Sequence, residues 1–239
     1  MPVTQIHAAL TPNGIRADAP DADIFARVMD EGVVLLKGVF PAEECRCLRD
    51  LAFEWGRSQD SSAQSDFYSL TARNHFCVES GISKIQKTLH FYRSHNFNDY
   101  REGLPEELSA LLSKFCPAIK EFYNRLTGNA ADFKGEQTLH PQIIHYPSGG
   151  GHFARHVHAL EPQKVGVITS LSSRGADFCR GGTGFDVRGE LVSVEESHDM
   201  GDIALFRYDL PHWVTPVDIA HAVDESSPRG RWTLIVPYY

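Results

Sequence analysis

The amino-acid sequence predicts a mainly β protein with flanking helices, built around a barrel or jelly roll. Helix-like segments come early in the chain, short β-prone runs dominate from Thr138 onward, and the glycine signatures of nucleotide-binding βαβ folds are missing. Many short strands at close spacing are typical of an antiparallel barrel or sandwich. The runs that we interpret as strands are residues 138–147, 164–172, 182–187, 190–196, 202–208, 212–217 and 231–239.

The first half predicts three helices that pack on the outside of this core. Each candidate has apolar residues at helical spacing or a proline at a natural first helical position. A β-branched apolar run and an aromatic run between them predict two strands, and a serine-rich stretch predicts a surface loop or lid. In chain order these are helix 21–30, strand 32–40, helix 41–55, loop 58–66, strand 84–97 and helix 104–127, bent or interrupted at Pro117.

Composition predicts an ordinary globular protein. The 239 residues are 42% hydrophobic and 23% charged, and no linker or repeat divides them. We expect a single domain over 1–239, in which 1–137 form the helical and strand buttress with the substrate-side elements and 138–239 form the metal-binding core.

Charge and cysteine usage narrow the partners and the location. The net charge is -8 and no Lys/Arg-rich tract is present, which disfavours nucleic acid. The apolar run at 32–40 is too short to span a membrane, and the N-terminus has neither the basic nor the apolar region of a signal peptide. Five scattered cysteines without a C-x-x-C pair predict a reduced, cytoplasmic protein.

Histidine usage points to the candidate site. Twelve histidines are present, five of them between residues 140 and 158. His156 and His158 are two residues apart, so on a strand both rings would point to the same face. His212 follows another strand candidate that a jelly roll could place opposite. A single histidine is more often a hydrogen-bonded core or surface residue, but three together predict one metal site.

Six short motifs carry a resemblance to a known family. They are YPSG at 146–149, HVH at 156–158, GGTGF at 181–185, GDIALF at 201–206, HWVTPV at 212–217 and GRWT at 230–233. In this order they resemble the Fe(II)/2-oxoglutarate-dependent dioxygenase superfamily, especially its prolyl-hydroxylase-like and phytanoyl-hydroxylase-like branches. The resemblance implies a double-stranded β-helix of the jelly-roll, cupin-like kind.

The family's functional residues would fall on the matching positions. The resemblance implies that His156, His158 and His212 bind Fe(II), and that Arg231, assisted by Thr233, binds the far carboxylate of the co-substrate 2-oxoglutarate. The planar fork of arginine suits such a carboxylate. A solvated charge at a strand end is an equally good interpretation of Arg231 by itself.

One position departs from the family pattern. The family has Asp or Glu where this sequence has His158, so the implied ligand set is three neutral imidazoles. We consider four explanations: a natural three-histidine variant, an engineered change, a carboxylate from elsewhere, or a degenerate site. Candidates for a substitute ligand are Glu161, Asp177 and Asp186, although turn or surface carboxylates are the simpler interpretation.

Other polar residues are assigned by strand alternation. If Tyr146 faces the interior, so does Gln142, and both could hydrogen-bond the 2-oxo acid, although a packed tyrosine is an equal alternative. A further polar group could form a substrate wall, but a solvated strand face is the favoured interpretation. That group is Arg73, Asn74, His75, His90, Tyr92, Arg93, His95 and Asn96.

The sequence thus predicts a non-haem iron oxygenase. It would couple 2-oxoglutarate decarboxylation by O2 to oxidation of a small polar metabolite or natural-product intermediate. One alternative is a three-histidine cupin-like dioxygenase that does not use 2-oxoglutarate, in which Arg231 has no role. Another is a non-catalytic metal-binding or ligand-binding relative.

Overall fold

Three helices lie where the sequence predicts them. They are α1 (Asp21–Met29), α2 (Ala42–Ser58) and α3 (Glu106–Thr127), and each begins directly after a proline and has two acidic residues in its first turn. Helix α3 continues through Pro117, so an interruption there is not seen. The computed structural model describes residues 3–30, 32–59, 74–83, 87–133 and 138–238.

The strands of the described residues join into one thirteen-stranded sheet. All seven runs predicted after residue 138 contain a strand, and so do the two runs predicted in the first half. The strands are β1 (Val3–Thr11), β2 (Gly14–Ala17), β3 (Val33–Lys37), β4 (His75–Ile82), β5 (Leu89–Asn96), β6 (Gln142–Pro147), β7 (His152–His156), β8 (Val165–Ser170), β9 (Gly182–Val187), β10 (Glu190–Ser193), β11 (Ile203–Arg207), β12 (His212–Thr215) and β13 (Gly230–Ile235).

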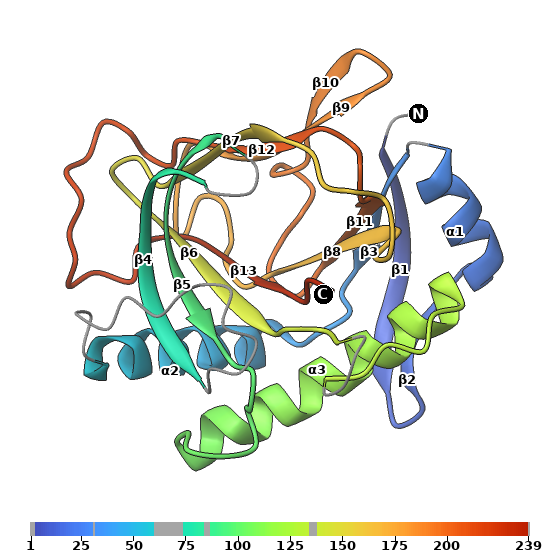
Figure 1. The fold of residues 1–239 in the computed structure, drawn as a ribbon, viewed down its shortest axis with the longest axis horizontal. Helices are drawn as coiled ribbons and strands as arrows, with labels where there is room; N and C mark the ends of the chain where they lie inside the picture. The colour runs from blue at the N-terminus through green and yellow to red at the C-terminus, as the bar shows by residue number, and fades with distance from the viewer. Residues whose placement is uncertain (1–2, 31, 60–73, 84–86, 134–137, 239) are drawn as a thin grey trace.

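The sheet curls around an interior, as Figure 1 shows, and this arrangement confirms the predicted jelly roll. Its strand order is β10-β9-β12-β7-β5-β6-β13-β8-β11-β3-β1-β2, and β4 pairs with β5. Almost all pairs are antiparallel, but β1 and β3 run parallel. Strand β13 lies between β6 and β8, so it joins the two parts of the sheet.

The first half contributes more strands than the sequence predicted. Strands β1, β2 and β4 were not expected, and β3 and β5 are hydrogen-bonded into the same sheet as the C-terminal strands. Residues 138–239, which we expected to form the core alone, therefore form the jelly roll together with strands from residues 3–96. The predicted loop at 58–66 lies outside the described residues, apart from Ser58 at the end of α2 and Gln59.

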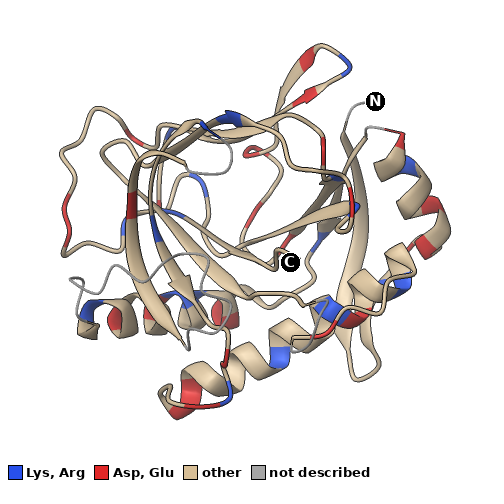
Figure 2. Ribbon diagram, viewed as in Figure 1, with Lys and Arg blue, Asp and Glu red and all other residues tan. Residues whose placement is uncertain are grey.

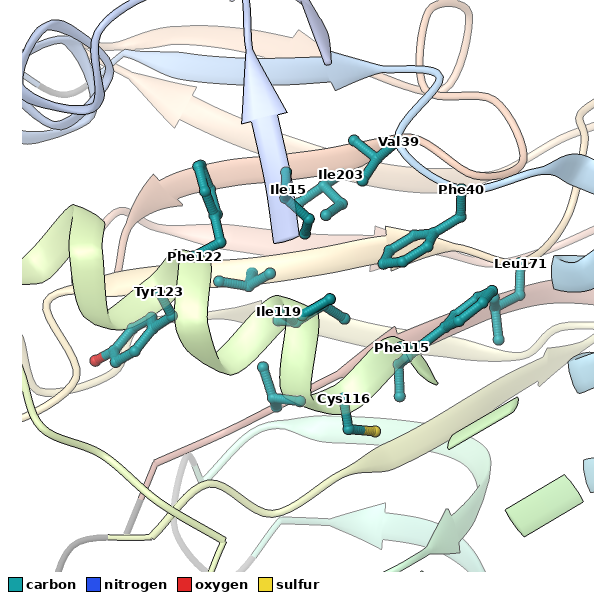
Figure 3. Close-up of a cluster of buried hydrophobic side chains, with 14 of the residues drawn as sticks. Ile15, Val39, Phe40, Phe115, Cys116, Ile119, Phe122, Tyr123, Leu171 and Ile203 are labelled. Atoms are coloured by element: carbon teal, nitrogen blue, oxygen red, sulfur yellow. The ribbon is translucent and has the colours of Figure 1, made fainter. Parts of the chain in front are cut away.

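Helix α3 covers one end of the sheet with its apolar face. Its side chains Phe115, Ile119 and Phe122 point toward strand residues and toward Phe40, as Figure 3 shows. The rings of Phe40 and Phe115 stack with 4.1 Å between their centroids. Burial of such large side chains fixes the helix against the sheet.

The surface carries charges of both signs. Figure 2 shows acidic and basic residues interspersed along all three helices. Every helix in the described ranges is too short or too polar to serve as a membrane span. All five cysteines are free thiols.

Candidate metal centre and cavity

Three histidines that are distant in the sequence converge at one point. One ring nitrogen from each of His156, His158 and His212 lies within 4.8 Å of the others. The ring centroids of His156 and His212 are 4.3 Å apart, and those of His156 and His158 are 4.9 Å apart. The structure therefore brings together the three residues that the sequence predicted as metal ligands.

The backbone achieves this convergence in a different way from simple strand alternation. His156 is the last residue of β7, and His158 lies beyond the strand. In the pairing of β7 with β12, His212 is opposite His156, whereas Val214 is opposite Phe153, so β7 has one extra residue. Such a β-bulge turns Phe153 and His156 to the same side, and their rings stack at 4.0 Å.

Hydrogen bonds orient two of the three rings. His156 Nδ1 donates to the carbonyl of Ala154 at 2.9 Å, and His212 Nδ1 donates to the carbonyl of Leu210 at 2.8 Å. A carbonyl accepts only, so each Nδ1 carries the proton and each Nε2 keeps its lone pair. The ring of His158 is held by stacking on Tyr208, with 4.3 Å between the centroids and 8° between the planes.

Burial keeps all three imidazoles neutral. It lowers the pKa of His156, and together with the neighbouring histidines it lowers the pKa of His212 well below the ordinary value. Burial and His156 lower the pKa of His158 to about 3. Neutral imidazole is the form that binds a metal, so this donor set fits a divalent transition metal such as iron.

A carboxylate is absent from this cluster within the described residues. Asp177 is paired with Arg49 at 2.7 Å, Asp186 is paired with Arg155, and Glu161 is exposed. None of the three lines the cavity described below. The hypothesis that one of them replaces the missing ligand is therefore wrong.

The three histidines open into a cavity of about 380 Å³. Strands β6 and β13 form one wall, because Tyr146 is the cross-strand partner of Arg231 and the positions alternate from there. The predicted site residues on this wall all line the cavity: Gln142, Tyr146, Arg231 and Thr233. The volume lies within the usual range for small-molecule sites, roughly 300–1,000 Å³.

Arg231 already has an anionic partner in the chain. Its Nε donates to Glu195 Oε1 at 2.6 Å, and both side chains are buried. The interpretation of Arg231 as a solvated charge at a strand end is thus wrong, because its side chain is buried and Glu195 is its partner. Arg231 Nη2, however, is buried without a hydrogen-bond partner among the described residues, and so is the hydroxyl of Thr183 on the same cavity. Both atoms remain available to an acceptor on a ligand.

Strand β5 corrects the interpretation of the polar run 90–96 as a solvated face. His90, Tyr92, Arg93, His95 and Asn96 are all buried, because one face of β5 lines the cavity and the other face lies against α2. His90 and Tyr92 line the cavity, whereas the ring of His95 packs beside Trp55 of α2. Asn74 donates to backbone carbonyls, His75 is half-buried, and Arg73 lies outside the described residues.

Several residues in the cavity or beside it were not predicted from the sequence. Glu195, within VEES, resembles a surface carboxylate, and Phe153 faces inward only because of the bulge. His90 and Tyr92 were named as part of a possible substrate wall, although a solvated strand face was favoured for them, and both line the cavity. Glu79, Thr183 and Tyr208 also line the cavity and were not predicted.

Comparison with known proteins identifies the fold. No family model matches the sequence, and no curated protein matches it. Among solved structures, a prolyl-4-hydroxylase from Pseudomonas putida is similar, with 15% identity, a TM-score of 0.56, and coverage of 92% of this chain and 98% of that one.

Two further structures agree. A prolyl hydroxylase from Trichoplax adhaerens, in complex with a peptide fragment of hypoxia inducible factor, has 12% identity, a TM-score of 0.59 and coverage of 92% and 90%. An oxidoreductase of the 2OG-Fe(II) oxygenase family from Burkholderia pseudomallei has 15% identity, a TM-score of 0.52 and coverage of 98% and 95%. The chain therefore has the jelly-roll fold of the prolyl hydroxylases and 2OG-Fe(II) oxygenases that it resembles.

Proposed function

We propose that the protein is a non-haem Fe(II) oxygenase that uses 2-oxoglutarate and O2 to oxidise a small polar molecule. One observation carries the proposal: three neutral imidazoles and a buried arginine with an unpartnered Nη2 line the same cavity. The similarity in fold to enzymes that are named as 2-oxoglutarate oxygenases supports it.

The metal would be held by His156, His158 and His212. The lone pairs of His156 and His212 are directed by the Nδ1 hydrogen bonds described above. Bound Fe(II) would bring O2 and the 2-oxo acid together and couple decarboxylation of the acid to oxidation of the substrate.

The remaining polar groups would bind and orient the acid. Arg231 Nη2 and the Thr183 hydroxyl are two buried donors without partners among the described residues, and Thr233 lies beside Arg231 on the inner face of β13. Burial raises the pKa of Tyr146 to about 12, so its phenol stays protonated and can donate to a carboxylate. Gln142 lies on the same face of β6.

The substrate would contact the wall formed by β4, β5 and β7. This wall combines the rings of His90, Tyr92 and Phe153 with the carboxylate of Glu79. Rings and a single carboxylate in a small cavity favour a compact molecule with polar groups.

A second candidate function is a three-histidine dioxygenase that does not use 2-oxoglutarate. Two observations favour it: the cluster has no carboxylate among the described residues, and Glu195 already neutralises Arg231. A non-catalytic metal-binding protein is the third candidate.

Location and organisation follow as lesser proposals. Five free thiols are suited to the reducing cytoplasm. A single domain, with no nucleic-acid or membrane partner, is consistent with the mixed surface charge.

Anaerobic titration tests the proposed function. Fe(II) and 2-oxoglutarate are added to the protein without O2, and the visible metal-to-ligand charge-transfer band of a chelated 2-oxo acid is expected. Metal binding without this band speaks against the proposed function. If O2 is then consumed in the presence of a substrate, the three-histidine dioxygenase is favoured. If no O2 is consumed, the non-catalytic protein is favoured.

A further inference from the structure

Glu195 is fixed against the arginine of the cavity. Its Oε1 accepts hydrogen bonds from Arg231 Nε and from the backbone N–H of Thr183, each at 2.6 Å. Gly182 makes room for it: a Cβ at this position would lie 2.1 Å from Glu195 Cγ. The glycine, the threonine amide and the arginine thus form a fitted pocket for one carboxylate.

This carboxylate is ionised, although it is buried. Burial would raise its pKa, but the charge of Arg231 and the hydrogen bond from the Thr183 N–H hold the pKa below the ordinary value. The neighbouring His198 is neutral at pH 7, because burial lowers its pKa. Glu195 is therefore a full negative charge beside a full positive charge.

Few other charges reach this cavity. Arg231 and Glu79 are the charged side chains among its described lining residues, and Glu79 is 26% exposed and lies 3.5 Å from His90. Water screens Glu79, whereas Arg231 and Glu195 are screened much less. The charge that a buried ligand experiences is thus set by the metal, Arg231 and Glu195.

A charge count explains why a buried glutamate is needed here. A divalent metal on three neutral histidines, with Arg231 and without Glu195, would leave three positive charges in the cavity. Glu195 reduces them to two, the charge that a doubly negative 2-oxo acid neutralises. In the H-x-D/E pattern the negative charge lies on the metal itself, at the position of His158.

We infer that Glu195 is a positioning residue that supplies, through Arg231, the negative charge missing from the metal ligands, and so limits how strongly the cavity favours a dianionic over a monoanionic 2-oxo acid. The inference rests on the proposed function. It makes Glu195 a determinant of co-substrate specificity that does not contact the metal.

Glu195→Gln tests the charge alone, because the amide oxygen can still accept from Arg231 Nε and Thr183 N–H. The protein is loaded with redox-inert Mn(II) without O2, and calorimetry measures Kd for 2-oxoglutarate and for 2-oxopentanoate, which lacks the far carboxylate. We expect the ratio of the two Kd values to shift in favour of 2-oxoglutarate, on the order of 10-fold, because a positive charge is uncovered.

A matched control is the neighbouring residue. Glu196→Gln makes the same substitution on a side chain that is 82% exposed and paired with Arg174 at the surface, and the ratio should stay within twofold of the wild-type value. Glu195→Asp keeps the charge but shortens the side chain, so both affinities should fall while their ratio is retained.

His158→Asp provides the opposite change. An added negative charge should shift the ratio toward 2-oxopentanoate, and the double variant with Glu195→Gln should restore the wild-type ratio. If Glu195→Gln does not fold, His158→Asp alone still tests the charge argument. An unchanged Kd ratio in His158→Asp would overturn the inference. An unchanged ratio, or an equal loss of both affinities, in folded Glu195→Gln would overturn it as well.

The same titrations separate the two proposals. If neither acid binds to the Mn(II)-loaded wild-type protein, the proposed function fails. If 2-oxoglutarate binds but the Kd ratio is the same in Glu195→Gln and the wild-type protein, the inference fails and the proposed function stands.

Discussion

His212 lies directly opposite His156 in the antiparallel pairing of β12 with β7. Each ring is oriented by a hydrogen bond from Nδ1 to the carbonyl two residues before it, Leu210 and Ala154 respectively. Two strands from different parts of the sequence thus present equivalent Nε2 lone pairs to one point. This pair is the rigid part of the proposed metal site, and His158 completes it from the segment after β7.

Removing either residue of this pair should abolish tight metal binding. We expect His156→Ala and His212→Ala each to weaken divalent-metal affinity by roughly 100-fold or more, because two donors remain of three. Competition with a chelating dye measures the affinity. His152→Ala is the control, since His152 is also on β7 and donates to a carbonyl two residues earlier, but it lies outside the cluster. Equal affinities of His152→Ala and His156→Ala would contradict the assignment.

Restoring a carboxylate at residue 158 should strengthen metal binding. His158→Asp is expected to raise divalent-metal affinity about 10-fold, because an anionic ligand attracts the cation more than a neutral imidazole does. His158→Asn, of similar size and neutral, should weaken binding instead. If three-histidine ligation defines the chemistry, His158→Asp should lose the native reaction although it binds the metal more tightly. If 2-oxoglutarate turnover is instead stimulated, the natural site is a weakened form of the site with two histidines and one carboxylate.

Stability should fall below pH 6.5 because of histidines far from the metal site. Burial lowers the pKa of His95 to about 4, and it lowers the pKa of His145 well below the ordinary value of 6.5. The unfolded chain binds protons on these rings below pH 6.5 while the folded chain does not, so the free energy of unfolding decreases as the pH falls. Each ring contributes at most about 1.4 kcal/mol per pH unit.

Urea unfolding between pH 8 and pH 4 measures this slope on the metal-free protein. Above pH 6.5 the two histidines should contribute no slope, since both states are then neutral. His95→Asn should reduce the slope below pH 6.5 relative to the wild-type protein. An identical slope in both proteins would show that His95 is not buried in the neutral form.

Gly182→Ala should disturb the carboxylate pocket. The glycine has φ of +122°, which an alanine rarely adopts, and the added Cβ would collide with Glu195. We expect a loss of about 2 kcal/mol or more in the free energy of unfolding, from backbone strain and displacement of the buried ion pair. Gly189→Ala is the control, with φ of +85° but open space around its Cβ, so it tests strain alone. Thermal or urea unfolding measures both, and equal losses would argue against the collision.

The sequence predicted the three helices and the C-terminal strands because their signals are local. Proline and acidic residues mark where α1, α2 and α3 begin. Strand alternation places Gln142 and Tyr146 on the same face of β6. His156, His158 and His212 came partly from spacing and partly from family resemblance. Their convergence depends on a bulge and on cross-strand register, which are not visible in the residues themselves.

What the sequence could not predict depends on contacts between distant segments. Strand β1 follows no simple alternation, and it lies in the sheet between β2 and β3, the latter pairing in parallel. The polar run of β5 is buried because its two faces meet the cavity and α2, so its polarity misled the prediction. Glu195 has no local signal, since only the fold places it beside Arg231.

The position of β13 also determines the order in which the molecule can be completed. Strands β6 and β8 are joined through β13, yet β13 follows every other strand along the chain. During synthesis the segments that carry the histidines emerge before Arg231 and Thr233, so the nascent chain has metal donors before it has the cavity wall that holds the acid. Final closure must therefore form contacts over long sequence separations, and such steps are slow and expose unpaired strand edges to aggregation.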